Sequence, residues 1–376
     1  MSWKNLTAAT AIVSLVSILT LALVEGFYSV VRWDRMDESI TLSAYRAIKR
    51  SLKGSGPEDT GGGLLLLTRQ DFEAALPMLE KANAGLGNTP YTSLASVNSA
   101  INVTGAGGCL GQKPDLRKIM VPLRTAAFEL FDPPNLFVDE TALADDAMKQ
   151  LLDRYGGTPA RLTTNAEGER TTLPAVTAAR KVLVAGDSVA NGTRLDDADT
   201  LASQLQAADA GRQYVNLGVG GARAADVLCR LEDALARYQG TVDAVIYVYC
   251  ENDFDAGAPF GTPAAAVEKL ATLAHEAGVG QVTVVYAPYL YNIVPHLSRF
   301  RGYRGDGFPS HATEANALAD AVAAAGFRFI DIRTMAAAEA RAGKTDFAVL
   351  GLFADAVHLS VAGTARLARL IRNGSP

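Results

Sequence analysis

The second half of the chain alternates short apolar runs with segments in which apolar residues recur every three or four positions. The apolar runs predict five strands, at residues 181–185, 213–217, 243–249, 281–287 and 327–331. The amphipathic segments predict five helices, at residues 199–208, 222–237, 263–277, 312–325 and 361–372. Strands that alternate with helices form a parallel sheet covered on both faces, so residues 176–376 are predicted to be one α/β domain.

The first part of the chain contains a segment of a different kind. Leu6–Val24 carries no charge and is long enough to cross a bilayer as a helix. Trp3 and Trp33 lie where interfacial aromatic residues are expected. We therefore predict a single-pass membrane anchor within residues 1–33 and not a cleaved signal peptide, which would have a shorter apolar region.

Residues 34–175 form an accessory region between the anchor and the α/β domain. This region is expected to be smaller and mostly helical, with one helix at residues 141–155. A short hairpin is predicted to turn near Glu167-Gly168, directly before the first strand of the domain.

Composition limits the partners and the chemistry. The net charge is −5 and no basic tract is present, which excludes nucleic acid as an expected partner. Cys109, Cys229 and Cys250 are too widely spaced for a metal site. Their number allows one disulfide, but three buried free thiols are the expectation, because cysteine is commonly buried as a small apolar residue.

Candidate chemistry follows the predicted strands. Gly186-Asp187-Ser188 ends the first strand, and a serine at such a turn is exposed beside free backbone N–H groups, although a helix cap is the simpler explanation of this serine. His358 is the only histidine of the four that has an acid, Asp355, three residues before it. A carboxylate that holds an imidazole leaves the other ring nitrogen free to take the proton of a serine, so Ser188, His358 and Asp355 form a candidate catalytic triad.

The next two strands end on candidate oxyanion donors. Gly221 lies in a glycine run after the second strand and could offer its backbone N–H. Asn252 follows the third strand and could offer its side-chain amide, whereas Asp253 is expected to anchor the loop. Because the carboxyl ends of parallel strands form the ligand edge of such sheets, these residues are predicted to lie near Ser188.

This combination resembles the SGNH (GDSL-like) hydrolase family across residues 178–376, because all four blocks occur in order. The resemblance implies a flavodoxin-like three-layer fold, a Ser188 nucleophile, oxyanion donors from Ser188, Gly221 and Asn252, and no metal or organic cofactor. One departure is Cys250, which stands where the family usually has the glycine of Gly-x-Asn-Asp. That departure puts the substrate range in doubt more than the catalysis.

The expected activity is a serine esterase or O-acyltransferase, acting on an ester-bearing small molecule or polysaccharide. Residues 288–311 mix aromatic residues with arginines, which suits a carbohydrate or an anionic group, and packing on the amino-terminal region is the equal alternative. The candidate substrate-binding residues in this loop are Tyr291, Arg299, Arg301 and Tyr303. If the protein is an enzyme, the alternative hypothesis is a lipase or thioesterase. If it is not an enzyme, the hypothesis is a non-catalytic subunit of a membrane complex.

An anchored domain of this kind resembles proteins that acetylate or deacetylate exported polysaccharides, some beside a multi-span acyltransferase. Membrane lipid and a multi-span membrane protein are therefore expected partners. The resemblance places the catalytic domain outside the cytoplasm. The basic residues that follow the anchor, which include Arg32, Arg35 and Arg46, favour the cytoplasm under the positive-inside rule. We follow the resemblance and expect the catalytic domain to lie outside the cytoplasm.

Overall fold

The computed structural model describes residues 101–105, 108–122, 135–144, 146, 149, 159–254, 257–293, 311–343, 351–355 and 357–373. The predicted anchor, residues 1–33, lies outside this part of the chain, as does the accessory region up to residue 100. Among the described residues, no helix has the length and hydrophobicity that a membrane span requires.

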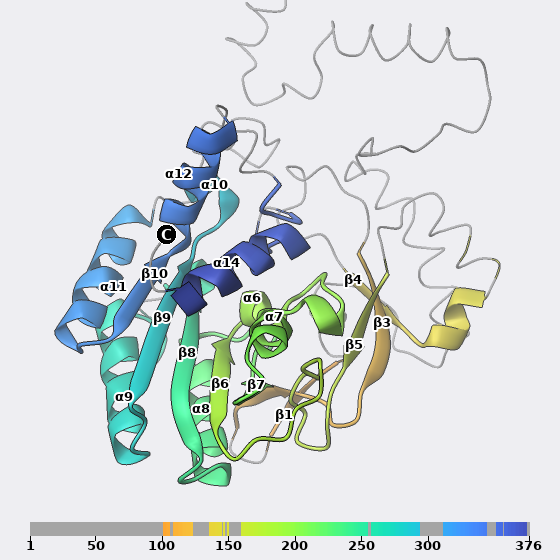
Figure 1. Ribbon diagram of the computed structural model, residues 1–376, viewed down its shortest axis with the longest axis horizontal. Coiled ribbons are helices and arrows are strands. Elements are labelled where there is room, and N and C mark those ends of the chain that lie inside the picture. Colours follow the sequence, from red (N-terminus) through yellow and green to blue (C-terminus); the bar gives the residue numbers. More distant parts are fainter. Residues whose placement is uncertain are drawn as a thin grey trace, which may run out of the picture. The chain divides into compact units, whose positions relative to one another are not determined.

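Five parallel strands form the central sheet (Figure 1). They are β6 (Lys181–Gly186), β7 (Gln213–Asn216), β8 (Val242–Cys250), β9 (Gln281–Ala287) and β10 (Arg328–Asp331). Their order across the sheet is β10-β9-β8-β6-β7, which is the order of flavodoxin-like sheets. The prediction of a five-stranded parallel α/β fold is confirmed, and each strand lies within a residue or two of its predicted bounds.

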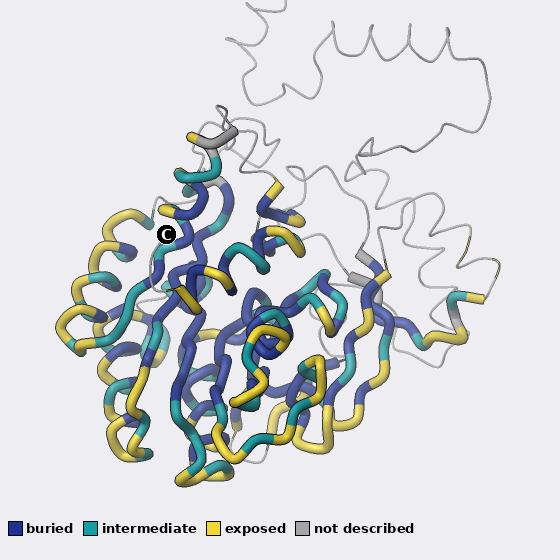
Figure 2. The backbone as a smooth tube through the Cα atoms, in the orientation of Figure 1, coloured by how far each residue is buried: buried dark blue, intermediate teal, exposed yellow. Residues whose placement is uncertain are grey.

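The five predicted helices are also present, as α7 (Leu201–Ala208), α8 (Ala224–Arg237), α9 (Pro263–Glu276), α11 (Ala312–Ala324) and α14 (Val361–Asn373). α8, α9 and α11 share one core with alternate residues of the strands. α7 and α14 pack on each other in front of the sheet in Figure 1. Figure 2 shows the central strands buried along most of their length. The prediction missed α12 (Ile332–Gly343), which begins directly after β10 without a turn signal.

The described part of the accessory region contains two sets of antiparallel strands. β1 (Asn102–Thr104) pairs with β2 (Leu110–Gln112). β3 (Arg117–Pro122), β4 (Asn135–Val138) and β5 (Ala160–Thr163) form a small sheet in the order β4-β3-β5. This described part is therefore not mostly helical as expected, because strands of three to six residues are too short to show a clear hydrophobic period. The rest of the predicted accessory region lies outside the described residues.

Two local predictions in the accessory region have definite outcomes. The hairpin is confirmed: Thr164 and Arg170 form an antiparallel bridge, and Gly168 takes the left-handed φ of 71° at the turn. The helix predicted at residues 141–155 is replaced at its start by a 3₁₀ helix, η2 (Glu140–Ala144), and most of its remaining length lies outside the described residues.

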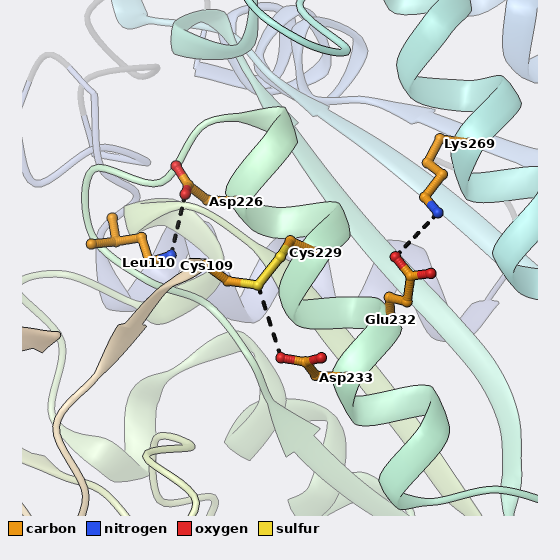
Figure 3. Close-up of a disulfide and its surroundings, with 7 residues drawn as sticks. All are labelled: Cys109, Leu110, Asp226, Cys229, Glu232, Asp233 and Lys269. Atoms are coloured by element: carbon orange, nitrogen blue, oxygen red, sulfur yellow. Dashed lines mark hydrogen bonds and ion pairs between the residues drawn. A yellow bond between two sulfur atoms is a disulfide. The ribbon is translucent and has the colours of Figure 1, made fainter. Parts of the chain in front are cut away.

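The expectation of three free thiols is wrong. Cys109, directly before β2, forms a disulfide with Cys229 of α8, 120 residues away in sequence (Figure 3). Asp226, one turn earlier on α8, accepts a hydrogen bond from the backbone N–H of Leu110 at 3.2 Å. The disulfide therefore ties the β1–β2 pair to the α/β domain. Cys250 is a buried free thiol.

Candidate active site

Ser188 lies at a sharp turn between β6 and the short helix α6 (Ser188–Asn191). Asp187 caps the helix, because its Oδ1 accepts a hydrogen bond from the N–H of Val189 at 2.8 Å. Gly186 has a φ of 155°, and a Cβ there would lie 2.7 Å from both the Ala190 Cβ and the Val248 carbonyl oxygen. Only glycine lets the chain turn this closely beside β8, so the backbone fixes where a half-buried Ser188 begins its helix.

Asp355 and His358 are held together at the segment before α14. His358 Nδ1 and Asp355 Oδ2 are 2.7 Å apart, and both residues are almost fully buried. The other carboxylate oxygen, Oδ1, accepts the backbone N–H groups of Val357 and His358, each at 2.7 Å. The Asp355–His358 contact that the sequence spacing predicts is therefore present, and it fixes the imidazole in one orientation.

The charges around Asp355 keep it ionised. Burial by itself would raise the pKa of this carboxyl, but the positive charges of His358 and Arg194 and the hydrogen bonds from His358 outweigh burial. The pKa of Asp355 consequently lies below its usual range. An ionised carboxylate can stabilise a positive charge that forms on the imidazole during a proton transfer.

Asp187 connects the end of β6 with the end of β8 and with His358. Cys250, Asn252 and the charge of His358 each act to lower the pKa of the Asp187 carboxyl, so all three lie near it. These interactions place the β6 turn, the β8 end and His358 within one group. Burial raises the pKa of Asp187, although the Val189 N–H and the His358 charge act in the opposite direction.

The two predicted oxyanion donors lie next to each other. Asn252 Nδ2 donates a hydrogen bond to the carbonyl oxygen of Ala222 at 3.0 Å, and Ala222 follows Gly221 directly. Gly221 is exposed and takes a left-handed φ of 81°, which glycine adopts readily. Asp253 anchors the loop as expected, since its Oδ2 accepts the Cys250 N–H at 3.0 Å.

Gly218 allows a close backbone contact that the sequence analysis did not predict. A Cβ on Gly218 would collide with the backbone of Ala190 and Asn191 in α6. The Asn191 side chain also donates a hydrogen bond to the Gly218 carbonyl at 2.9 Å. The loop after β7 therefore packs directly on the helix that starts with Ser188.

The predicted substrate-binding residues have a different outcome. Tyr291 lies in the short helix α10 (Leu290–Ile293), which follows β9, and its side chain is outside the described part of the structure. Arg299, Arg301 and Tyr303 lie in residues 294–310, which are also outside it. The contacts of all four side chains stay a prediction.

Glu251 is a buried residue that the sequence analysis missed. Both of its carboxylate oxygens accept a hydrogen bond from Asn292 Nδ2 at 2.7 Å, and Oε1 also accepts one from the Tyr286 hydroxyl at 3.1 Å. Burial raises the pKa of Glu251 to about 7. Since Glu251 precedes Asn252, these bonds fix α10 beside the end of β8.

Two arginines were also missed. Arg170 is fully buried and ion-pairs with Asp197 at 3.0 Å, and Arg194 ion-pairs with Asp355 at 2.5 Å. Neither pair shows a sequence signal, because the partners are brought together by the path of the chain and not by helical or strand spacing.

The carboxyl-terminal half of the chain matches a known family. Residues 184–366 match the family model of the GDSL-like lipase/acylhydrolase family. The matched range begins within β6 and ends within α14, so it includes Ser188, Gly221, Asn252, Asp355 and His358. A search of curated proteins found no match.

Three solved structures illustrate the likeness. A lipase/acylhydrolase from Enterococcus faecalis is 21% identical, with 51% of this chain and 93% of that chain covered and a TM-score of 0.38. An acetylxylan esterase from Geobacillus stearothermophilus is 22% identical, with 52% and 94% covered and a TM-score of 0.36. A member of the lipolytic G-D-S-L family from Veillonella parvula is 15% identical, with 53% and 99% covered and a TM-score of 0.38.

Proposed function

We propose that this chain, an SGNH-type hydrolase of the GDSL-like lipase/acylhydrolase family across residues 184–366, is a serine esterase or O-acyltransferase that acts on acetyl esters of a glycan. Ser188 is the nucleophile, His358 the general base and Asp355 the carboxylate that orients it. The observation that carries this proposal is the buried hydrogen bond of 2.7 Å between Asp355 and His358, close to the turn at which β6 presents Ser188.

The proposed reaction has two halves. His358 takes the proton of the Ser188 hydroxyl while the oxygen attacks the ester carbonyl, and Asp355 stabilises the resulting imidazolium. The imidazolium then gives its proton to the leaving alcohol, which leaves an acyl group on Ser188. Water completes a hydrolysis, and a sugar hydroxyl completes a transfer. Either one gives its proton to His358 as it attacks the acyl group, and His358 then gives that proton to the Ser188 oxygen as the acyl group leaves it.

The oxyanion of each tetrahedral intermediate needs donors. We assign this role to the N–H groups of Ser188 and Gly221 and to the side-chain amide of Asn252. The Asn252 amide donates to the Ala222 carbonyl and lies near the Asp187 carboxyl, so substrate binding has to redirect an N–H group of this amide toward the oxyanion. Loss of one such donor typically costs about 3–4 kcal/mol of transition-state stabilisation.

A glycan substrate is supported by the position of α10 and by the residue types that follow it in the sequence. Asn292 of α10 is bonded to Glu251, the residue before Asn252, so α10 lies beside the proposed oxyanion donor. Tyr291, Arg299, Arg301 and Tyr303 supply aromatic faces and planar cations, which suit sugar rings and anionic groups. Release of acetate from acetylated xylan, compared with release of a long-chain acid from its ester, separates this proposal from a lipase or thioesterase.

A location outside the cytoplasm is supported by the Cys109–Cys229 disulfide, since disulfides persist in oxidising compartments. With an anchor in residues 1–33, the enzyme would be held at the outer side of a membrane, where a multi-span acyltransferase could supply the acyl group. Fusing a reporter that is active on only one side of the membrane to the carboxyl terminus tests the orientation. Activity on the cytoplasmic side would overturn it.

The central experiment is a pair of matched substitutions. Ser188→Ala and His358→Ala are expected to abolish hydrolysis of p-nitrophenyl acetate and labelling by a fluorophosphonate probe. His275→Ala is the control, because His275 is exposed on α9 and far in sequence from any proposed catalytic residue. If a folded Ser188→Ala variant keeps wild-type turnover, the proposed function is wrong.

A further inference from the structure

The proposed catalytic acid has a second cationic partner besides the histidine. Arg194 Nε lies 2.5 Å from Asp355 Oδ2, the same oxygen that contacts His358 Nδ1 at 2.7 Å. The Arg194 and Asp355 side chains are 7% and 2% exposed, so water screens this ion pair weakly. One carboxylate oxygen thus shares its negative charge between a permanent cation and an imidazole.

Arg194 is tied to the turn that carries the nucleophile. The Ser188 carbonyl accepts the N–H groups of Gly192 at 3.0 Å and Thr193 at 2.9 Å, immediately before Arg194. Arg194 itself has a φ of 72°, a left-handed conformation that is unfavourable for a non-glycine residue. A costly backbone conformation persists only where the surrounding structure holds it.

Residues of the accessory region hold the backbone of Arg194 in this conformation. Arg170, at the end of the hairpin, donates to the carbonyls of Gly192 at 2.8 Å and Leu195 at 2.6 Å, on either side of Arg194. The backbone N–H of Arg194 donates to the Met120 sulfur of β3 at 3.3 Å, and Met120 is fully buried. The small sheet and the hairpin therefore fix the segment in which Arg194 lies beside Asp355.

We propose that Arg194 is a positioning residue of the Asp355–His358 pair, and that the small sheet and hairpin serve to hold it there; this inference rests on the proposed function. Among the described residues, His358 contacts Asp355 and interacts with the charge of Asp187, and Arg194 ion-pairs with the Asp355 oxygen that contacts His358. Removing Arg194 takes a positive charge away from that oxygen and leaves both carboxyls in place, so the imidazole should bind a proton more readily. Arg194 therefore favours the form of His358 that can accept the Ser188 proton.

The test compares full-length Arg194→Gln and Arg194→Lys across pH. Both replacements are unbranched and meet the same left-handed backbone, but only lysine keeps the charge. With glutamine, the acidic limb of kcat/KM for p-nitrophenyl acetate should move to higher pH by about one unit. With lysine, it should stay within a few tenths of a unit of wild type. Arg194→Asn is a second neutral variant, because asparagine tolerates a left-handed backbone.

The matched control is Arg212→Gln, which removes an Nε–Oδ2 ion pair of 2.7 Å with Asp209 between α7 and β7. Its pH profile should equal that of wild type. A folded neutral variant with an unshifted acidic limb would overturn the inference, and so would a lysine variant that shifts as far as glutamine.

An independent readout separates this inference from the proposed function. The titration of the His358 imidazole, followed by NMR in wild type and in the Arg194 variants, requires no turnover. If Ser188→Ala keeps activity but Arg194→Gln still shifts the imidazole titration upward, the proposed function is wrong and the effect of Arg194 on His358 is supported. If Ser188→Ala is inactive and neither neutral variant shifts that titration, the proposed role of Arg194 is wrong and the proposed function is supported.

Discussion

Arg170 is expected to be one of the most important polar residues for the stability of this protein. Its guanidinium is fully buried and donates to Asp197 Oδ1 at 3.0 Å and to four backbone carbonyls. The carbonyls belong to Arg161, Asn191, Gly192 and Leu195, at 2.6 to 3.0 Å. Arg170→Met keeps most of the unbranched apolar stem and removes every one of these bonds.

The magnitude follows from what the substitution leaves behind. Asp197 would stay buried, and among the described residues its carboxylate would keep only the hydrogen bonds from Thr163, whose hydroxyl lies 2.6 Å away. Breaking a buried ion pair by removing one partner costs about 3–5 kcal/mol, and the orphaned carbonyls act in the same direction. We expect Arg170→Met to lower the free energy of unfolding by at least about 4 kcal/mol, a large share of the total for an ordinary domain.

The assay is urea unfolding followed by circular dichroism. Arg180→Met is the matched control, because the Arg180–Asp243 pair of 3.2 Å is exposed on the arginine side and should contribute less than about 1 kcal/mol. If Arg170→Met costs no more than Arg180→Met, the argument for a buried clamp is refuted. A double-mutant cycle with Asp197→Asn would then measure how much of the effect belongs to the ion pair itself.

Two further predictions concern the disulfide and a buried carboxyl. The double variant Cys109→Ala/Cys229→Ala should lose about 2–5 kcal/mol of stability. Thiol titration of unreduced, unfolded protein should find Cys250 alone, and any larger count contradicts the disulfide. Because the pKa of Glu251 rises from 4.5 to about 7 on folding, the folded protein binds a proton there that the unfolded chain releases, so stability should fall as pH rises through this window, by about 3 kcal/mol. Glu251→Gln should remove that decline in urea unfolding at pH 5 and 7.5, and parallel pH dependences in the two proteins would count against it.

The main domain could be predicted from the sequence because its elements are long and strongly patterned. Each of the five strands is an apolar run, and the strands alternate with amphipathic helices, a combination that is typical of a covered parallel sheet. The Asp355–His358 contact was equally predictable, since three residues in one loop let the two side chains meet. Ser188, Gly221 and Asn252 could be predicted as site residues because parallel strands end at one edge of the sheet.

The sequence by itself therefore determined the α/β architecture and the residues that form the candidate triad. The tertiary structure alone decided the antiparallel small sheet, the Cys109–Cys229 disulfide and the two buried arginine pairs. The physical reason is the distance along the chain between the residues that interact. Hydrophobic period and cap residues record which way a side chain faces relative to its own element. The partner that a side chain meets across a fold depends on loop paths and on the packing of distant elements, which no local pattern records. Arg194 and Asp355 meet only because the loop after α6 and the segment before α14 come together in the folded chain.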